Sequence, residues 1–313
     1  GIGTVFTMIT TGSSNLYIIV QQRMFAATNS FPLMAIPFFV LAGNLMETGG
    51  ISRRIVNFFK MLLRRQHAAS ASITTVASAF FGAISGSGPA TTAAIGGLMI
   101  PSMKETGYKP AEAAAIAAAS GILGVIIPPS IPMVTYATTA GVSVGTMFIA
   151  GIVPGLLLCL AYILVHQLQY RRVETATREK IGRKVILHTT LDALWALGMP
   201  LIILGGIYGG IFTPTEAAAV ACVYAFLVGK FVYQELGWKD IGQILAKSAK
   251  TTAAIMFIIA VASPFGWLMT KYNVPNAIAT AILTTFNSKF VVFLMVNLFL
   301  LFLGCFMDTQ SII

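Results

Sequence analysis

The segment ITTVASAFFGAISGSGPATTAAI, residues 73–95, gives the strongest indication of how this chain folds. An apolar run enters the small polar sequence Ser85-Gly86-Ser87-Gly88-Pro89 and then resumes. The interruption comes before the roughly 20 apolar residues that a complete membrane span needs. A helix that turns back inside the hydrocarbon layer is tolerated only where it is buried in protein or lines a wet cavity. We therefore predict a re-entrant helical hairpin over residues 73–95.

A second copy of this pattern lies at the end of the sequence. Residues 291–313, VVFLMVNLFLLFLGCFMDTQSII, also run from an apolar segment through a glycine-containing polar turn and become apolar again. In this alignment Gly304 stands opposite Gly86, and Thr309 stands opposite Thr91. The similarity predicts a second hairpin, and with it an architecture built from two repeats.

Two further similarities accompany the hairpins. Residues 38–52 and 261–275 each read as an apolar helix ending in Leu-Met, then a polar turn, then a second helix. Residues 109–117 and 213–221 share a Pro-x-Glu-Ala-Ala-Ala core, in which proline suits the first helical position. The glutamates of that core fall where the helix dipole favours negative charge, so we expect them to stabilise helix starts rather than to carry protons. They are Glu112 and Glu216.

Composition places the chain in a membrane. The 313 residues are 57% hydrophobic and only 10% charged, whereas soluble domains carry about a quarter charged residues. Residues 147–168 and 291–307 approach the length of a membrane span. The three cysteines lie in apolar segments without paired spacing, so neither a disulfide framework nor a zinc site is indicated. The sequence predicts an all-α polytopic membrane protein.

The net charge of +10 reflects orientation in the membrane rather than nucleic-acid binding. Basic residues collect between apolar spans, at 171–184 and at 230–250. By the positive-inside rule, both connections are expected on the cytoplasmic side. The sequence begins at Gly1 without an initiating methionine and ends at Ile313 without a polar tail, so we expect it to be part of a longer chain.

Residues 51–65, ISRRIVNFFKMLLRR, predict an amphipathic helix. Basic residues surround an apolar stripe at helical spacing. Such a helix either lies along the membrane interface or packs on the helical bundle, and the sequence leaves both open. The residues of the expected stripe are Ile51, Ile55, Phe58, Phe59 and Leu62.

Three prolines interrupt the helix that begins near residue 110. Pro128, Pro129 and Pro132 each remove a backbone donor and force the preceding residue out of helical geometry. Whereas one proline would only kink a helix, three within five residues should break it. We predict two half-helices that meet around the sequence IIPPSIP.

Nothing in the sequence indicates catalysis. The three histidines lie far apart, and the nucleotide-binding, metalloprotease and nucleophile-elbow motifs are absent, so we predict no enzyme activity and no cofactor. A hairpin tip offers ion binding instead, because the carbonyl end of one half-helix attracts a cation and the amide end of the next attracts a carboxylate. Discontinuous helices that meet near mid-membrane are typical of transporter sites.

Asp308 is the most informative acid, because it follows the apolar run 291–307 and lies in the expected second tip. An ionisable group at such a depth is expensive unless it is functional or paired. We expect it to bind a cation or shape the tip. The alternative is a cap for the helix that begins at Thr309.

Four segments resemble the large membrane subunit of tripartite ATP-independent periplasmic (TRAP) transporters. The likeness runs from about residue 31 to the end, and GAISGSGPAT with IIPPSIPM is quite specific. The segments are FFVLAGNLMETGGI, FGAISGSGPATTAAIGGLMIP, ILGVIIPPSIPMV and GIFTPTEAAAVA.

The resemblance implies a multi-pass protein of the bacterial inner membrane that works with partners. A soluble periplasmic binding protein would deliver an organic acid, of the C4-dicarboxylate or sialic acid type, and a small four-helix membrane subunit would pair with this one. A sodium gradient would drive uptake, with Na⁺ as coupling ion. The fold would be an inverted repeat in which hairpins and broken helices move like an elevator against a scaffold.

The resemblance also assigns regions and residues. Scaffold and interfacial helices would occupy 1–72, hairpin 1 and the first broken helix 73–146, further scaffold, loops and the start of the second repeat 147–290, and a truncated hairpin 2 291–313. The substrate side of the first tip would use Pro89, Thr91 and Thr92. Ion binding would use Ser85, Gly86, Ser87, Gly88, Gly124, Pro128, Pro129 and Ser130, with Gly304, Asp308 and Thr309 in the second tip.

Family members continue past that second tip into another broken helix, so part of the second ion site and of the substrate surface is expected beyond Ile313. Residues 1–313 alone are therefore predicted not to transport. Two other functions stay open from the residues themselves. A channel or an ATP-driven permease subunit would need no ion sites in hairpins, and a membrane enzyme acting on lipid would need paired acids or histidine clusters.

Overall fold

The computed structural model describes residues 16–174, 182–286, 288–307 and 309–313, and every regular element in these ranges is a helix. Among the described residues, five helices are long and apolar enough to cross a membrane. They are Phe31–Thr48, Val144–Gln169, Arg183–Tyr208, Pro214–Val232 and Trp238–Lys271. A sixth candidate consists of Pro110–Ile126 and Ile131–Ala140, two halves bent by 41°. The prediction of an all-α polytopic membrane protein is confirmed.

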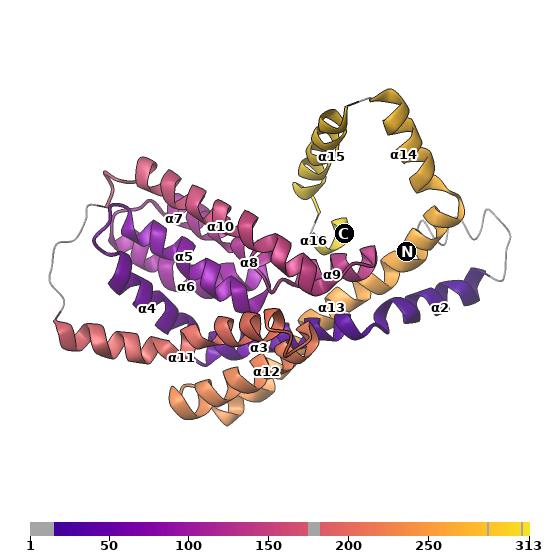
Figure 1. Cartoon of the computed structure of the whole chain (residues 1–313). Coiled ribbons are helices and arrows are strands. Elements are labelled where there is room, and N and C mark those ends of the chain that lie inside the picture. The colour runs from indigo at the N-terminus through magenta and orange to yellow at the C-terminus, as the bar shows by residue number, and fades with distance from the viewer. Residues whose placement is uncertain (1–15, 175–181, 287, 308) are drawn as a thin grey trace. The chain divides into compact units, whose positions relative to one another are not determined.

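The chain divides into two compact units (Figure 1). The larger unit is Phe31–Thr251, and the other combines the described part of residues 1–30 with Thr252–Ile313. The larger one contains η1 (Phe31–Met34), α3 (Ala35–Thr48), α4 (Ile51–Leu63), α5 (Ala69–Ser85), α6 (Gly88–Glu105), α7 (Pro110–Gly121), α8 (Leu123–Ile126), α9 (Ile131–Ala140), α10 (Val144–Gln169), α11 (Arg183–Tyr208), α12 (Pro214–Leu227) and η2 (Val228–Val232). The smaller one contains α2 (Leu16–Thr28), α14 (Val274–Thr285), α15 (Lys289–Gly304) and α16 (Thr309–Ile312), and α13 (Trp238–Lys271) passes from one unit to the other.

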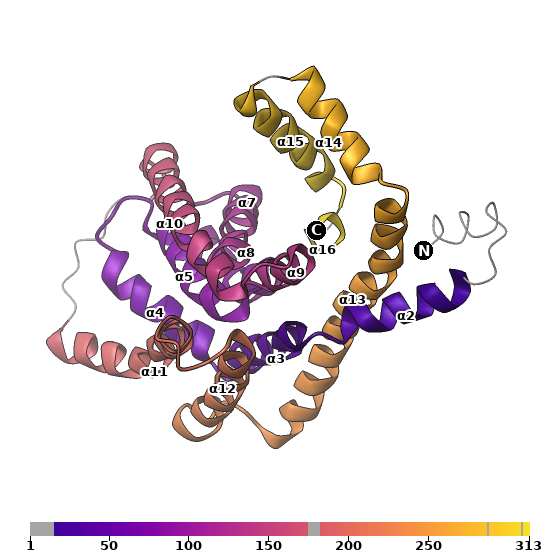
Figure 2. The ribbon, with the colours of Figure 1, turned by 45° about the vertical axis from the view of Figure 1, so that its right-hand side comes forward.

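Helix α5 lies at the centre of the larger unit. All of its residues except Val76 and Phe80 are buried, and its neighbours include α4, α6, α7, α8 and α10. Figures 1 and 2 show these helices gathered around it. The turn Gly86-Ser87 separates α5 from α6, which returns alongside it. The predicted helical hairpin is therefore present, and its first arm is enclosed by protein as an interrupted helix in a membrane requires.

The amphipathic helix α4 packs on the bundle. Ile51, Ile55 and Phe59 are buried as expected, and the main neighbours of α4 are α5 and α11. Phe58 is half-buried, Leu62 is exposed, and Val56, which was not in the predicted stripe, is buried. The helix thus packs on the bundle, which is one of the two arrangements that the sequence left open.

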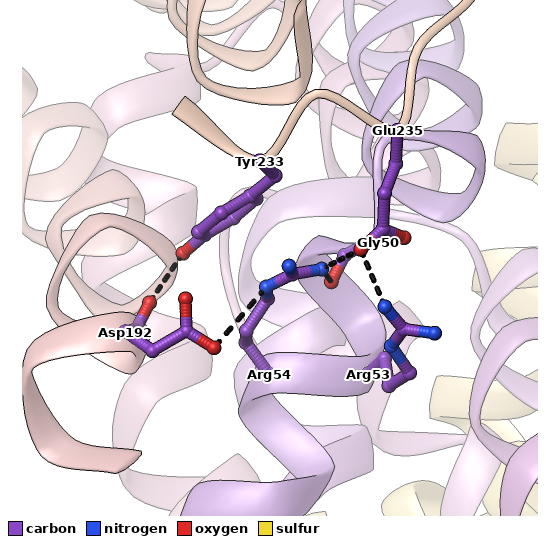
Figure 3. A network of polar contacts seen from close by, with 6 residues as sticks. All are labelled: Gly50, Arg53, Arg54, Asp192, Tyr233 and Glu235. Carbon is purple, nitrogen blue, oxygen red and sulfur yellow. Dashed lines mark hydrogen bonds and ion pairs between the residues drawn. The ribbon is translucent and has the colours of Figure 1, made fainter. Parts of the chain in front are cut away.

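A charged cluster fixes α4 to α11 and to the segment after η2 (Figure 3). Arg54 bonds to the Glu235 carboxylate, lies 3.4 Å from Asp192 Oδ2 and stacks on the Tyr233 ring at 3.9 Å. The Tyr233 hydroxyl donates to the Asp192 backbone carbonyl at 2.6 Å. Burial, and next the nearby Asp192, raise the pKa of Tyr233, so the phenol keeps its proton and remains a donor. Arg53 pairs with the same Glu235 at 2.5 Å.

Residues 38–52 and 261–275, which the sequence predicted to be similar, share one local structure. Gly49 and Gly50 separate α3 from α4, and Tyr272 and Asn273 separate α13 from α14. The second residue of each turn has a positive φ, +77° at Gly50 and +58° at Asn273. Each segment is thus an apolar helix, a two-residue turn and a second helix, as predicted. The turn chemistry explains the choice of residues, because glycine and asparagine tolerate this backbone region best.

The third similarity has a different origin. Both glutamates accept a hydrogen bond from a backbone amide three residues earlier, Glu112 from Lys109 at 3.1 Å and Glu216 from Thr213 at 2.8 Å. Thr213 also accepts from the Glu216 amide, which completes a capping box. Helix α7 follows the first hairpin, whereas α12 precedes the second copy, so this pair is not part of the repeat order. The likeness reflects a shared way of starting a helix.

Candidate functional site

The tip of the α5–α6 hairpin is built from small residues with defined backbone roles. Helix α5 ends at Ser85, and Gly86 then adopts a left-handed conformation, φ +62°, while its amide donates to the Gly82 carbonyl at 3.0 Å. Ser87 is extended and caps α6, its hydroxyl accepting from the Ala90 amide at 3.4 Å. Pro89 follows in the first turn of α6, where no amide donor is needed.

The broken helix has a second interruption of the same kind. Helix α8 ends at Ile126, and Ser130 caps α9 by accepting from the Met133 amide at 3.4 Å. The Ser130 hydroxyl also donates to the Val125 carbonyl at 2.5 Å, so it connects the two half-helices. Pro132 occupies the first turn of α9. The predicted break around IIPPSIP is confirmed.

The two interruptions are near copies of one another. Each helix restarts with Ser-x-Pro, Ser87-Gly88-Pro89 in one case and Ser130-Ile131-Pro132 in the other. The cap conformations agree closely, φ −134° and ψ 123° at Ser87 against φ −131° and ψ 129° at Ser130. Each interruption therefore presents the carbonyl end of one helix beside the amide end of the next.

The structure brings these interruptions into contact. The Ile131 amide donates to the Gly86 carbonyl at 3.0 Å. A side chain on Gly86 would begin 3.0 Å from the Pro129 carbonyl oxygen, and one on Gly124 would begin 2.9 Å from the Ser87 carbonyl oxygen. Two helix ends and two helix starts thus meet in one place. The first-tip residues named from the sequence, with the Pro128–Ser130 segment and Gly124, lie together there.

Polar oxygens concentrate at this junction. The hydroxyls of Ser85 and Thr91 are 3.0 Å apart, and the Thr91 hydroxyl donates to the Ser87 carbonyl at 2.8 Å. Ser85, Thr91 and Ser130 are all nearly or completely buried. Thr91 was expected on the substrate side, and its hydroxyl lies among the oxygens of the tip. Pro89 is exposed and Thr92 is half-buried.

The junction has the chemistry of a site for a hard cation. Residues 85–92 and 121–132 contain no charged side chain, histidine or cysteine, so the local field comes from peptide dipoles and hydroxyls. Within the described ranges, no group of three or more histidine, cysteine, aspartate or glutamate residues could hold a metal ion. Neutral carbonyl and hydroxyl oxygens fit an alkali cation better than a transition metal, which prefers nitrogen or sulfur ligands.

The second tip belongs to the smaller unit. Helix α15 ends at Gly304, and α16 begins at Thr309. Asp308 lies outside the described residues, so its expected role in ion binding or capping stays a prediction. Gly304 and Thr309 therefore bracket a helical interruption, as the alignment with the first tip predicted.

Sequence reasoning missed the bonds that join the two interruptions. The hydrogen bond between Ile131 and Gly86 joins the start of α9 to the turn after α5, and no motif specifies it. It also missed that Ser130 donates across its own break to Val125. One signal was available, since the Ser-x-Pro sequence occurs at both restarts and nominates Ser87 and Ser130 as caps.

Comparison with known proteins gives a consistent result. The sequence model of the family described as tripartite ATP-independent periplasmic transporter, DctM component, matches residues 1–313. The chain is 43% identical to the isethionate TRAP transporter permease protein DctMQ of Oleidesulfovibrio alaskensis, over all of this chain and 49% of that protein. It is 41% identical to the C4-dicarboxylate TRAP transporter large permease protein DctM of Pseudomonas aeruginosa, over 93% of this chain and 68% of that protein.

A third relative is the sialic acid TRAP transporter large permease protein SiaM of Vibrio cholerae, which is 36% identical over 98% of this chain and 71% of its own length. The chain thus spans about half of the first of these relatives and about two thirds of the others. All three are named as permeases rather than enzymes, in agreement with the prediction of a non-enzymatic protein.

Proposed function

Because the chain belongs to the family of the DctM component of tripartite ATP-independent periplasmic transporters, we propose that it forms the ion-binding part of a large permease subunit that takes up an organic acid. The observation that carries the proposal is the junction of two interrupted helices, Ser85–Thr91 and Ile126–Ser130. It combines buried hydroxyls, clustered carbonyls and two helix ends in a chain with several candidate spans. Discontinuous helices of this kind bind coupling ions in secondary transporters.

The coupling ion is proposed to be Na⁺, held by the oxygens of the first tip and of the broken helix. The Thr91 hydroxyl and the Ser87 carbonyl would be its central ligands, because these neutral oxygens lie together with the Ser85 hydroxyl at the junction. The exposed Pro89 and the adjacent Thr92 would face the carboxylate, since α6 begins here and a helix N-terminus attracts anions. No resident cofactor is required.

The substrate would be a small organic acid. The relatives' names include isethionate, C4-dicarboxylate and sialic acid transporters, all of which carry anionic substrates. A periplasmic binding protein would deliver the acid, and a small membrane subunit would complete the assembly in the inner membrane. The test is uptake of radiolabelled organic acids by the full-length protein with these partners in proteoliposomes. Uptake that needs ATP and ignores sodium would contradict the proposal.

The role of the tip can be tested with two isosteric variants. Thr91→Val removes one hydroxyl from the cluster, and we expect it to raise the sodium concentration for half-maximal uptake about tenfold, the effect of losing one bond to a charged group. Thr74→Val is the matched control, because Thr74 is equally buried and donates to the Ser70 carbonyl four residues earlier, at the other end of α5. Equal sodium curves for the two variants would remove Thr91 from the site.

Transport would proceed by an elevator motion of the hairpin and broken helix against α3, α4, α11 and α12. The junction supports this proposal because it is held within one set of helices, α5 to α9, that can move without separating its ligands. Spectroscopic labels on α9 and α11 should change their separation when sodium and substrate are added. A constant separation under all ligand conditions would contradict the motion.

A further inference from the structure

A cavity lined by charged and polar side chains lies away from the hairpin tip, at the opposite end of α5. Its volume is about 390 Å³, and its walls come from α4, the start of α5, the end of α6, the residues after α10 and the first turns of α11. The wall has two basic side chains. Lys60 lies in the last turn of α4, and Arg64 is the residue after that helix. Neither the proposed transport site nor the charged cluster around Arg54 includes this cavity.

The two cations of the cavity lack a charge partner. Lys60 donates to the Ser102 hydroxyl at 3.0 Å, and within the described part of the chain neither Lys60 nor Arg64 forms an ion pair. By contrast, Arg53, Arg54 and Lys247 all bond to carboxylates. The cavity therefore holds two positive charges that form no ion pair with the described residues.

The one acid in the wall is already engaged. Glu174 accepts hydrogen bonds from the Ser70 amide at 2.7 Å, the Ser70 hydroxyl at 2.9 Å and the Tyr108 hydroxyl at 3.2 Å. These bonds use both carboxylate oxygens and fix the carboxylate to the start of α5. Glu174 therefore shapes one side of the cavity and leaves Lys60 and Arg64 available to an external anion.

The remaining wall mixes apolar side chains with the polar side chains of Asn57, Ser70, Ser102 and Thr189. Met61, Ile73 and Val185 line it, and the cavity sits where α10 has ended and α11 begins, on either side of the basic connection 171–184. The end of a span beside a basic connection corresponds to the headgroup level of a membrane. The cavity thus offers paired cations next to apolar side chains, the combination that an amphipathic anion requires.

We propose that this cavity binds an anionic phosphate group, with Lys60 and Arg64 as its ligands. The apolar side chains of the wall favour a phospholipid headgroup as the source of that phosphate, because the acyl chains could continue along Met61 and Val185. Since the wall combines α4 and α11 with both arms of the hairpin, the bound headgroup would bridge these elements. The proposal is independent of the transport function and of the ion that drives it.

The test measures binding of short-chain phosphatidylglycerol to the detergent-purified full-length protein by native mass spectrometry. The double variant Lys60→Gln/Arg64→Gln should bind it about 25-fold more weakly, at roughly fivefold for each basic residue near an anionic headgroup. Arg65→Gln is the matched control, because Arg65 is the adjacent basic residue, is exposed and does not line the cavity. Its binding should equal that of the wild type. The charge-conserving variant Lys60→Arg should retain binding and shows that the fold tolerates change there.

Additional arms identify the source of the phosphate. Inorganic phosphate that competes with phosphatidylglycerol would support a shared phosphate site. Binding of inorganic phosphate to the wild type and not to the double variant, without any binding of phosphatidylglycerol, would support the site and assign it to a free anion. Wild-type binding by the double variant, or an equal loss in Arg65→Gln, would overturn the proposal. Phosphatidylcholine binding that matches phosphatidylglycerol binding would also overturn it, because a net negative charge would then be unnecessary.

Discussion

The hairpin junction and the Arg54 cluster are both polar regions between packed helices, but different groups form them. The junction around Thr91 uses hydroxyls, carbonyls and helix ends, with no charged side chain. The cluster uses two arginines and two acids that neutralise one another around Tyr233 (Figure 3). Charges that are already compensated have little capacity for a ligand, whereas neutral oxygens can accept a cation. The comparison separates a region that fixes the fold from a region that can bind.

The largest effect on stability is expected when the charged cluster is broken. Arg54→Leu would remove the cation that Glu235 and Asp192 share, and among the described residues only Glu235 would keep a second partner, Arg53. The Arg54 side chain is 13% exposed, whereas those of Glu235 and Asp192 are 27% and 40% exposed. We expect a loss of about 3 kcal/mol in the free energy of unfolding, because this one substitution removes two ion pairs and the stacking on Tyr233. Arg53→Leu is the control, since Arg53 is 57% exposed and should contribute less than about 1 kcal/mol. Equal losses measured by thermal unfolding in detergent would contradict the structural role of Arg54.

An intermediate effect is expected where the two interruptions touch. Gly124→Ala would place a methyl group 2.9 Å from the Ser87 carbonyl oxygen and 3.1 Å from Thr91 Cβ. Overpacking of this kind destabilises by about 1–3 kcal/mol. Here it would also displace the proposed ion ligands, so sodium-dependent uptake should be lost even at temperatures where the variant remains folded. Gly97→Ala serves as control because nothing lies within 4 Å of the added methyl group. Normal sodium-dependent uptake by Gly124→Ala would show that the close approach has no functional role.

The smallest effects are expected from the helix caps, where a cap inside the proposed ion site can be compared with one outside it. Ser87→Ala and Ser143→Ala each remove a cap whose hydroxyl accepts an amide hydrogen at 3.4 Å, so each should destabilise by about 1 kcal/mol. Only Ser87 lies in the proposed ion site, and its replacement should weaken the sodium dependence of uptake. Ser143, which caps α10, should leave that dependence unchanged. An unaltered sodium response in Ser87→Ala would exclude the Ser87 hydroxyl as a ligand.

Local patterns made the interruptions predictable from the sequence. Between Ser85 and Pro132, glycine permits the left-handed turn and the prolines remove amide donors, so the hairpin turn and the broken helix follow from neighbouring residues. The junction itself was not predictable in detail. The bond between Ile131 and Gly86 depends on how two helices approach each other, which no short motif encodes.

Long-range pairing was equally inaccessible. Arg54 appeared in the sequence as one of several basic residues around an amphipathic helix, and its partner Glu235 is 181 positions away. The same limit explains the exposed Leu62, because helical spacing identifies a face but not the point at which the neighbouring helices end. Patterns of period 3.6 specify which residues can be buried together, and only the packed bundle specifies which of them are.

The enclosure of α5 has a consequence for biogenesis. Its hydroxyl-bearing residues Ser70, Ser72, Thr74, Thr75 and Ser78 are buried against protein, so the helix is suited to a protein environment and poorly suited to lipid. A newly synthesised α5 should therefore insert weakly by itself and wait near the translocon until later helices such as α10 are made. Glycosylation mapping of truncated nascent chains would reveal this delay. Early, independent insertion of α5 would show that the finished bundle does not dictate the order of its assembly.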